Sequence, residues 1–488
     1  MSLLNNVIKL YFSQRAKAVD EFRRRPLETQ QRMFSSLLES GSRSKFGAEY
    51  NITPSMSWES FSRTVPIFEY DDFKPYIERM LAGERDVTTP GRVRYYAKSS
   101  GTTSDRSKFI PISDKALHTT HRRGMQDVGM LYLDAHPGGG ALNGKFLSLG
   151  GSCSRQGGNL IGDLSAILIN DSKIVSGWFR APKMSTALIK NFEQKCQRIC
   201  QESTRDNITA FVGVPSWNLA LMSRILDYTG KSSLREVWPN LSLFVHGGIE
   251  MGPYRQSFDK LYGGEGLQYM ETYNASEGFV AIADDPSRDD MLLMLDYDTF
   301  YEFRSESEVV PLEGVKLGVH YAVIMTSING LWRYEIGDTV EFTSLSPYRI
   351  KFAGRTKQYI NTFGEEVMVD NTDRAVVEAS RRLGVVVSDY SVAPRYMDIN
   401  SRGGHEWIVE FVTPPLDIEL FTKELDSALR SINSDYDAKR ESTLEMLTLN
   451  VAPRGMFLRW MEEHGKNKIP RLSKERTAFE SMLSMINR

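Results

Sequence analysis

The chain has 488 residues, with 60 Lys and Arg against 62 Asp and Glu, a formal charge of -2 and three cysteines. A chain of this length can bury a large core, and length alone suggests about two to four domains. The near-neutral balance argues against a general nucleic-acid binder, which needs clustered excess Lys and Arg. Three cysteines cannot form a disulfide framework, so a reducing compartment fits best.

No stretch of the sequence approaches the roughly 18 consecutive apolar residues that a membrane span requires. The N-terminal segment interrupts its apolar residues with Asn5, Asn6 and Lys9, which predicts an amphipathic helix and not a signal peptide. We therefore expect a soluble cytoplasmic protein with no nucleic-acid or membrane partner. The sequence leaves the oligomeric state open.

The first part of the chain alternates between helical and strand-like patterns. A helical pattern runs from residue 1 to about residue 38, and another begins after Ser113. Strands are predicted at residues 94–97, 145–149, 166–170, 208–212 and 241–245, and further helices at 188–201 and 216–226. Strands that alternate with helices predict an α/β sheet with crossover connections.

The pattern changes after residue 290. Strand-like runs follow each other with no helix between them as far as residue 354, which predicts an antiparallel or barrel-like β subdomain. A polar junction at 354–357 then marks a domain boundary and hinge near Arg355. Beyond it we predict a small α+β domain with helices near Thr372 and at 418–432 and strands at 385–392, 406–412 and 444–451. The predicted domains are thus 1–354 and 355–488.

The strongest local motif spans residues 98–108, with the sequence Lys-Ser-Ser-Gly-Thr-Thr-Ser-Asp-Arg-Ser-Lys. It follows a predicted strand and precedes a predicted helix. Hydroxyls, an unhindered glycine and a lysine in one loop supply donors suited to phosphate oxygens. The motif is not a Walker A loop, because the second glycine is missing and the lysine is one residue too far from Gly101. On composition alone, a polar Ser/Thr loop without function is the favoured interpretation.

Three weaker motifs follow. In the run 273–277, Tyr273 can stack on a base, Ser276 can donate a hydrogen bond and Glu277 supplies a hard oxygen ligand for magnesium. In the run 332–338, Asp338 follows a glycine and can accept both ribose hydroxyls, although a plain β-turn aspartate has the same appearance. The run 465–471 is a basic turn, and the simplest interpretation is that its charged side chains are solvated.

The order and spacing of these four motifs resemble the adenylate-forming enzymes, and specifically the Gretchen Hagen family of acyl acid amido synthetases known from auxin and jasmonate conjugation. The resemblance covers nearly the whole chain. It includes Lys-Phe-Gly-Ala-Glu-Tyr at 45–50, Tyr-Asp-Asp-Phe-Lys-Pro-Tyr-Ile at 70–77, Val-Gly-Val-Pro-Ser-Trp at 212–217 and His-Gly-Gly at 246–248. The fold that it implies has a large N-terminal α/β domain and a small, mobile C-terminal α+β domain.

The resemblance also implies roles for individual residues. ATP phosphates would be held by Ser99, Ser100, Gly101, Thr102 and Thr103, with Lys108 nearby. The adenine pocket would be lined by Gly247, Gly248, Tyr273, Asn274, Ala275 and Ser276. Glu277 would bind Mg²⁺, Asp338 the ribose, and Arg355 would sit at the hinge, while Lys468 would reach the phosphate in one domain arrangement. Asn274 and Ala275 stand where the family commonly has a glycine and another small residue, which leaves the acyl specificity open.

The implied activity is ATP-dependent activation of a carboxylic acid as acyl-AMP, followed by transfer to an amine, usually an amino acid. The alternatives are an acyl-CoA ligase with the same first step and a non-catalytic nucleotide- or acyl-binding protein. Arg123 and Trp217 are weaker candidates for the acyl site. His118 and His121 share a predicted helix face and are interpreted as a solvated pair.

Overall fold

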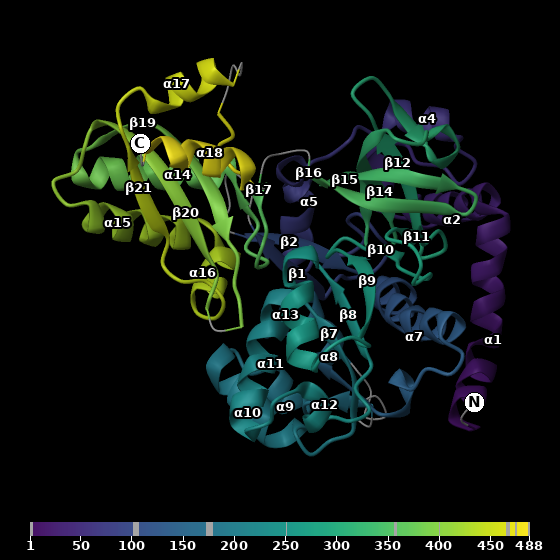
Figure 1. Cartoon of the computed structure of the whole chain (residues 1–488). Helices are drawn as coiled ribbons and strands as arrows, with labels where there is room; N and C mark the ends of the chain where they lie inside the picture. Colours follow the sequence, from purple (N-terminus) through teal and green to yellow (C-terminus); the bar gives the residue numbers. More distant parts are fainter. Residues whose placement is uncertain are drawn as a thin grey trace.

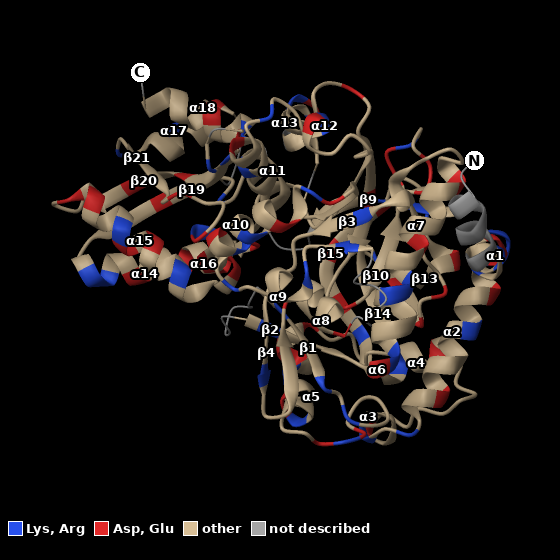
Figure 2. Ribbon diagram, turned by 90° about the horizontal axis from the view of Figure 1, so that it is seen from below, with Lys and Arg blue, Asp and Glu red and all other residues tan. Residues whose placement is uncertain are grey.

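A computed structural model of the chain describes residues 3–100, 107–171, 179–249, 251–355, 359–399, 401–464, 469–473 and 476–486. Figure 1 shows a large part that contains the N-terminus and a smaller part, drawn in yellow-green, that contains the C-terminus. In Figure 2, Lys and Arg are interspersed with Asp and Glu over both parts, as the near-zero net charge predicts.

The large part is built on a 12-stranded sheet of order β13-β12-β14-β15-β16-β11-β10-β9-β8-β7-β3-β6. At one end of this order, the strands β9, β8, β7, β3 and β6 run parallel to one another. They are β3 (Lys145–Ser148), β6 (Arg180–Ala181), β7 (Ile208–Gly213), β8 (Leu243–Gly247) and β9 (Gln268–Asn274). The helices between them are α9 (Met184–Ala187), α10 (Phe192–Ser203), α11 (Pro215–Thr229), α12 (Leu234–Val237) and α13 (Gly252–Tyr262). This alternation confirms the predicted α/β class.

The remaining strands of this sheet pair antiparallel and cover the predicted β-rich segment. They are β10 (Phe279–Ile282), β11 (Met291–Leu293), β12 (Thr299–Arg304), β13 (Val309–Pro311), β14 (His320–Ser327), β15 (Leu331–Leu345) and β16 (Tyr348–Arg355). They do not form a sheet of their own, because β10 pairs with β9 and joins them to the parallel strands.

Five helices open the chain: α1 (Leu3–Arg24), α2 (Pro26–Gly41), α3 (Lys45–Glu49), α4 (Trp58–Thr64) and α5 (Tyr70–Leu81). The predicted helical run over the first 38 residues is therefore two helices. The break falls at Pro26, which occupies the first position of α2. Proline lacks the amide hydrogen that would continue α1 and disfavours helical geometry at the residue before it. Phe34 of α2 packs against Phe300 of β12, with 4.6 Å between ring centroids.

A second sheet of order β2-β1-β5-β4 carries the predicted phosphate loop. Its strands are β1 (Tyr95–Ser100), β2 (Ser107–Ile112), β4 (Cys153–Gln156) and β5 (Asn159–Gly162). The loop therefore joins two antiparallel strands, and the prediction that a helix follows it directly was wrong. The helix predicted after Ser113 is present as α6 (Asp114–Ala116), a π-helical segment (Leu117–Arg122) and α7 (Arg123–Ala135).

The strand predicted at 166–170 was also wrong, because this run lies in helix α8 (Leu164–Asn170). Ala166, Ile167 and Ile169 are its buried residues. A short apolar run has the same appearance in a buried strand and a buried helix, so periodicity alone cannot separate the two.

The C-terminal part contains a sheet of order β19-β20-β21 and a two-stranded β17-β18 ladder. The strands are β17 (Tyr359–Ile360), β18 (Val367–Met368), β19 (Val386–Arg395), β20 (Gly404–Thr413) and β21 (Thr448–Ala452). The helices are α14 (Val369–Leu383), α15 (Ile418–Ile432), α16 (Ser434–Arg440), α17 (Met456–Glu463) and α18 (Thr477–Ile486). The helix predicted at 418–432 is confirmed as α15, which buries Phe421, Leu425 and Leu429.

The segment that follows β16 attaches the C-terminal part to α11 and α13. Ser216 donates a hydrogen bond to the Phe363 carbonyl at 3.2 Å, and Tyr254 donates one to the Thr362 carbonyl at 2.6 Å. One hydrophobic cluster runs through both parts. Among the helices of the described chain, none is long and apolar enough to cross a bilayer.

Candidate active site

The second and third predicted motifs meet in the structure. The Tyr273 hydroxyl on β9 donates a hydrogen bond to Asp338 Oδ2 on β15 at 2.6 Å. Strands β10, β11 and β16 lie between β9 and β15 in the sheet order. Because four strand spacings amount to about 19 Å across a flat sheet, the sheet must curl to bring these side chains together. The Tyr273 ring packs edge-on against Phe352, with 5.9 Å between centroids, so the pair is held on two sides.

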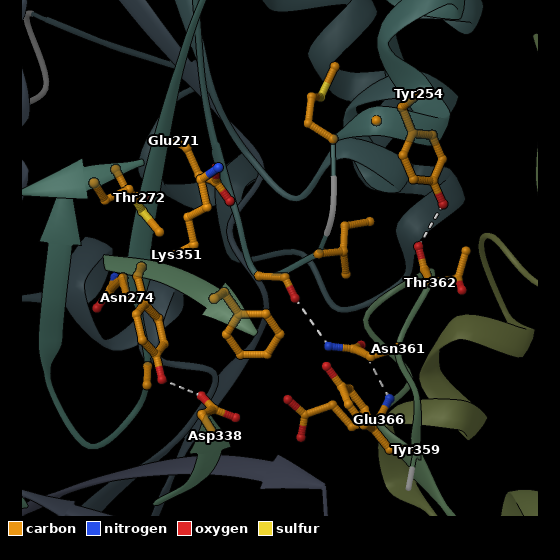
Figure 3. Close-up of a pocket in the computed structure, with 18 of the residues that line it drawn as sticks. Tyr254, Glu271, Thr272, Asn274, Asp338, Lys351, Tyr359, Asn361, Thr362 and Glu366 are labelled. Atoms are coloured by element: carbon orange, nitrogen blue, oxygen red, sulfur yellow. Dashed lines mark hydrogen bonds between the residues drawn. The ribbon is translucent and has the colours of Figure 1, made fainter. Parts of the chain in front are cut away.

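This pair lies beside a cavity of about 560 Å³ (Figure 3), a size typical of small-molecule sites. On the large part, five of the predicted residues line the cavity: Gly248, Tyr273, Asn274, Ala275 and Asp338. On the side of the C-terminal part it is lined by Tyr359, Asn361, Thr362, Glu366 and Tyr396. A ligand in this cavity therefore contacts both parts of the chain.

The turn after β8 supplies a backbone wall. A side chain at Gly247 would place Cβ 2.3 Å from the Thr272 carbonyl oxygen, so only glycine fits there. Gly248 has φ of +82°, in the left-handed region that favours glycine. The Gly248 carbonyl accepts a hydrogen bond from Asn361 Nδ2 at 3.1 Å, which joins this turn to the C-terminal part. The backbone at this turn can thus approach a flat ligand closely.

Glu277 lies in the turn between β9 and β10 and is 8% exposed. Burial raises the pKa of its carboxyl to about 7, although the charge of Lys108 acts in the opposite direction. The Glu277 carbonyl accepts a hydrogen bond from Asn329 at 2.9 Å, which fixes the turn. A buried carboxyl with a lysine nearby is a position where added positive charge would be stabilised.

Lys108 lies on β2 directly opposite Ser99 of β1. Its ammonium group is 5.8 Å from the centre of the Tyr70 ring. Because the charge of Lys108 acts on the Glu277 carboxyl, this pairing places Ser99 of the first predicted motif near Glu277 as well. Ser100 ends β1, whereas Gly101, Thr102 and Thr103 lie outside the described residues. Their predicted contact with phosphate stays a prediction.

The predicted acyl residues Arg123 and Trp217 do not line the cavity. Arg123 donates a hydrogen bond to the Asp296 carbonyl at 3.3 Å. Trp217 packs against Phe192, with 5.9 Å between centroids, and the Lys439 ammonium lies 4.2 Å from the centre of its ring. Trp217 thus belongs to the contact between α11 and α16, and neither residue's role in acyl binding gains support from its position.

Arg355 ends β16, where it pairs with Asp338 of β15. The predicted hinge residues 356 and 357 and the predicted catalytic Lys468 lie outside the described residues. Ser276 lies in the turn between Ala275 and Glu277, beside the cavity lining. The roles of these residues stay predictions.

Sequence reasoning missed two features of the site. The first is the segment 359–366, which lines the cavity directly after the junction that marked the domain boundary. Its position next to that junction was the available signal. The second is His121, which was interpreted as solvated but is fully buried. Leu117, Thr120, His121 and Gly124 are buried and recur at helical spacing, so the position of His121 relative to Leu117 was the available signal.

The fold is that of the adenylate-forming ligases. A solved 2-hydroxyisobutyryl-CoA ligase, in complex with its acyl-AMP and CoA, shares it with a TM-score of 0.59 at 15% identity, over 95% of this chain and 92% of that chain. A solved GH3.15 acyl acid amido synthetase, in complex with 2,4-DB, shares it with a TM-score of 0.60 at 19% identity, over 94% and 93%.

Within this class the chain belongs to the GH3 family, the Gretchen Hagen family that the motifs predicted. The GH3 family N-terminal domain matches residues 15–159 and 153–267, the central domain 292–355 and the C-terminal domain 370–477. A relative from Nicotiana attenuata, the jasmonoyl–L-amino acid synthetase JAR6, is 22% identical over 94% of this chain and 92% of its own length.

Proposed function

We propose that this chain is an ATP-dependent acyl acid-amido synthetase that joins a small carboxylic acid to an amino acid. The observation that carries the proposal is the cavity in which the Tyr273–Asp338 pair faces a wall from the C-terminal part. The family and the relatives, named as amido and amino acid synthetases, support the same reaction class. A cytoplasmic location, with small-molecule partners only, remains part of the proposal.

The reaction needs two steps because a carboxylate is a poor electrophile with a poor leaving group. In the first step a carboxylate oxygen attacks the α-phosphorus of ATP, and the bond to pyrophosphate breaks. In the second step an amine nitrogen attacks the acyl carbon, the bond to AMP breaks and the amine loses a proton. The protein supplies positioning and prearranged donors for the charge that develops, of which each is typically worth about 100- to 1000-fold in rate.

The residues around the cavity divide these tasks. Adenine would lie between the Gly248 turn and the Tyr273 ring, while Asp338 accepts hydrogen bonds from the ribose hydroxyls. Ser99 and Lys108, which pair across β1 and β2, would contact the phosphates. The effect of Lys108 on Glu277 is consistent with this position. The loop 100–103 and Lys468 complete the phosphate contacts in this proposal.

Magnesium fits the site as a phosphate-bound ion. Among the described residues, no group of three or more His, Cys, Asp or Glu side chains is arranged to hold a metal. Mg²⁺ commonly takes only one or two carboxylates and completes its shell with phosphate and water. Glu277 would supply that carboxylate, since a nearby cation would favour the ionised form that burial disfavours. When bound, the ion would neutralise charge on the phosphates.

The two parts would rotate about residues 355–357 between the steps, so that Lys468 contacts phosphate in only one arrangement. The boundary at residues 354 and 355 falls where β16 ends and the segment that lines the cavity begins. Ser216 and Tyr254 of the large part donate hydrogen bonds to the segment after β16, and Asn361 of that segment donates one to Gly248. These hydrogen bonds between the two parts would then break and form during turnover.

The test is a panel of carboxylic acids scored by ATP–pyrophosphate exchange on the full chain, followed by an amine panel with the best acid. Exchange with an acid and amide formation with an amino acid are the expected results. ATP binding without exchange for any acid would instead support a non-catalytic nucleotide-binding protein.

An acyl-CoA ligase is the second candidate, because a CoA ligase shares the fold over nearly the whole chain. It differs only in the second step, in which a thiol attacks the acyl carbon. Assays of amide and thioester formation in parallel from the same acid separate the two. Thioester without amide would replace the first proposal by the second.

A further inference from the structure

The π-helical segment Leu117–Arg122 buries a histidine against the site. His121 has no exposed surface, whereas His118, three residues earlier on the same segment, is exposed. Segments of π-helix are rare and often occur at functional sites. A buried histidine is usually explained by hydrogen bonds to its ring, so its partners decide whether it is structural.

The packing of α7 shows which surface His121 faces. Gly124, one helical turn later, lies so close to Phe279 that a Cβ on Gly124 would be 2.2 Å from the ring. Phe279 pairs with Asn274 across β10 and β9, so both side chains lie on the same face of the sheet. His121 and Gly124 share a helix face and therefore both meet this surface. Figure 3 shows the Asn274 side chain directed away from Asp338.

Asn274 is the polar side chain that His121 faces. Within the described part of the chain, however, neither ring nitrogen of His121 has a hydrogen-bond partner of ordinary geometry, and neither does Asn274 Oδ1. Burial lowers the pKa of His121 to about 4, so the ring is neutral near pH 7 and carries one donor and one acceptor. These atoms therefore form an incompletely satisfied polar group behind the cavity.

The burial of Asn274 Oδ1 beside His121 determines which end of the Asn274 carboxamide can contact a ligand. Its Oδ1 is buried, while the residue lines the cavity, which leaves Nδ2 as the end of the carboxamide that reaches the ligand. The neutral His121 ring can donate to Oδ1 and so hold this orientation. Because side chains alternate along a strand, Asn274 points away from the side on which Tyr273 meets Asp338. The donor is thus not directed at the ribose.

The acyl group is the remaining ligand for this donor. Asn361, Thr362 and Tyr396 line the cavity from the C-terminal part, and the amine would approach from that side. The acyl chain, which is bonded to the same phosphate, would then extend toward the face of β9 on which the Asn274 side chain lies. We propose that Asn274 and His121 form a polar acyl subsite that selects carboxylic acids carrying an oxygen substituent next to the carboxylate. Asn274 Nδ2 donates to that oxygen, and His121 acts as a positioning residue.

This inference rests on the proposed function, because it assumes that an acid is activated in this cavity. The test uses matched acids in ATP–pyrophosphate exchange on the full chain: lactate with propionate, 2-hydroxyhexanoate with hexanoate, and phenyllactate with phenylpropionate. In every pair that supports exchange, we expect kcat/KM to be about 10-fold or more higher for the oxygenated acid, since a site built to hydrogen-bond a hydroxyl rejects its isostere.

The variants separate a specific role from a structural one. Asn274→Leu should reduce the advantage of the oxygenated acid to less than about 2-fold, through a higher KM for that acid. His121→Phe should reduce it in the same way, and His121→Gln, which keeps a donor, should restore most of it. His118→Phe makes the same substitution at an exposed position of the same segment and should retain the wild-type advantage.

Two outcomes overturn the inference. One is equal kcat/KM within each pair for the wild-type chain, which would mean that buried water satisfies these atoms. The other is an oxygen advantage that survives Asn274→Leu. Exchange without the advantage refutes the subsite alone, whereas ATP binding without exchange for any acid refutes the proposed function and the subsite with it.

Discussion

The hydrogen bond between Tyr273 and Asp338 makes Tyr273→Phe an informative perturbation of the proposed nucleotide site. The substitution removes one hydroxyl and keeps the ring, which Phe352 holds by an edge contact with 5.9 Å between centroids. Asp338 then loses the donor at 2.6 Å that orients its carboxylate. Stacking on adenine is preserved, so the variant isolates the effect of that one hydrogen bond on ribose recognition.

The magnitude follows from the charge of the acceptor and its burial. A hydrogen bond to a charged group contributes about 1.5 to 3 kcal/mol. Asp338 is only 5% exposed, so water replaces the lost donor poorly. Because a bound ribose hydroxyl can take over part of the contact, we expect the lower end of this range for binding. The Kd for ATP should therefore rise about 10-fold, which corresponds to about 1.4 kcal/mol.

Isothermal titration calorimetry with ATP measures this effect, and Tyr301→Phe is the matched control. Tyr301 is fully buried, and within the described part of the chain its hydroxyl has no hydrogen-bond partner. Its removal should leave ATP affinity unchanged and should not lower the free energy of unfolding, because an unsatisfied polar group is lost. The two variants remove the same atom and differ only in whether it has a partner.

A double-mutant cycle gives the decisive result. Asp338→Ala alone should weaken ATP binding by about 1 to 3 kcal/mol. If Tyr273 acts through Asp338, then Tyr273→Phe should have almost no further effect in the Asp338→Ala background. Full additivity of the two substitutions, or an ATP affinity of Tyr273→Phe within 2-fold of wild type, would refute the coupling and remove Asp338 from the ribose site.

Further predictions concern the phosphates, the core and pH. Glu277→Gln should lower pyrophosphate exchange about 100- to 1000-fold with an unchanged circular dichroism spectrum, and EDTA should abolish exchange reversibly; normal exchange in either case would exclude the metal role. Glu302→Gln should lower the free energy of unfolding in urea by about 3 kcal/mol, because Glu302 and Arg333 form a buried ion pair at 2.9 Å, and a change below 1 kcal/mol would contradict this. Burial lowers the pKa of His121 and His246 to about 4, so the unfolded chain binds more protons below pH 6.5. Stability should fall between pH 6.5 and 4 by about 3 kcal/mol for each histidine, and His246→Phe should flatten that slope in unfolding curves at pH 7 and 5.

Sequence patterns predicted correctly those helices and strands whose apolar residues recur with a clear period. Helix α15 was predicted over its full length because Phe421, Leu425 and Leu429 recur at helical spacing and are buried. The run at 166–170 was assigned to the wrong class because its few apolar residues carry no period. The break at Pro26 has a clear local cause, since proline cannot continue α1, yet the apolar stripe on both sides obscured it.

The candidate site depends on contacts between residues far apart in the chain, which the spacing of residues in the sequence does not reveal. Tyr273 and Asp338 lie 65 positions apart, and only the curl of the sheet brings them to 2.6 Å. Resemblance to a family grouped these residues before the structure did, since their chemistry alone also fitted ordinary turns. His121 shows the opposite case. Its burial follows from helical spacing with the buried Leu117 and Gly124, whereas its polar side chain favoured the solvated interpretation.

The β15–β16 ladder connects nucleotide binding with the placement of the C-terminal part. Asp338 pairs with Arg355 across these strands, so the proposed ribose ligand and the start of the proposed hinge are direct neighbours. The chain that leaves Arg355 continues into the segment with Asn361, which lines the cavity and holds the Gly248 turn. A nucleotide bound between Asp338 and the Gly248 turn would therefore contact both sides of this connection. If the proposed nucleotide site is correct, the ligand would act on the contact between the two parts directly, without a relay through the hydrophobic core.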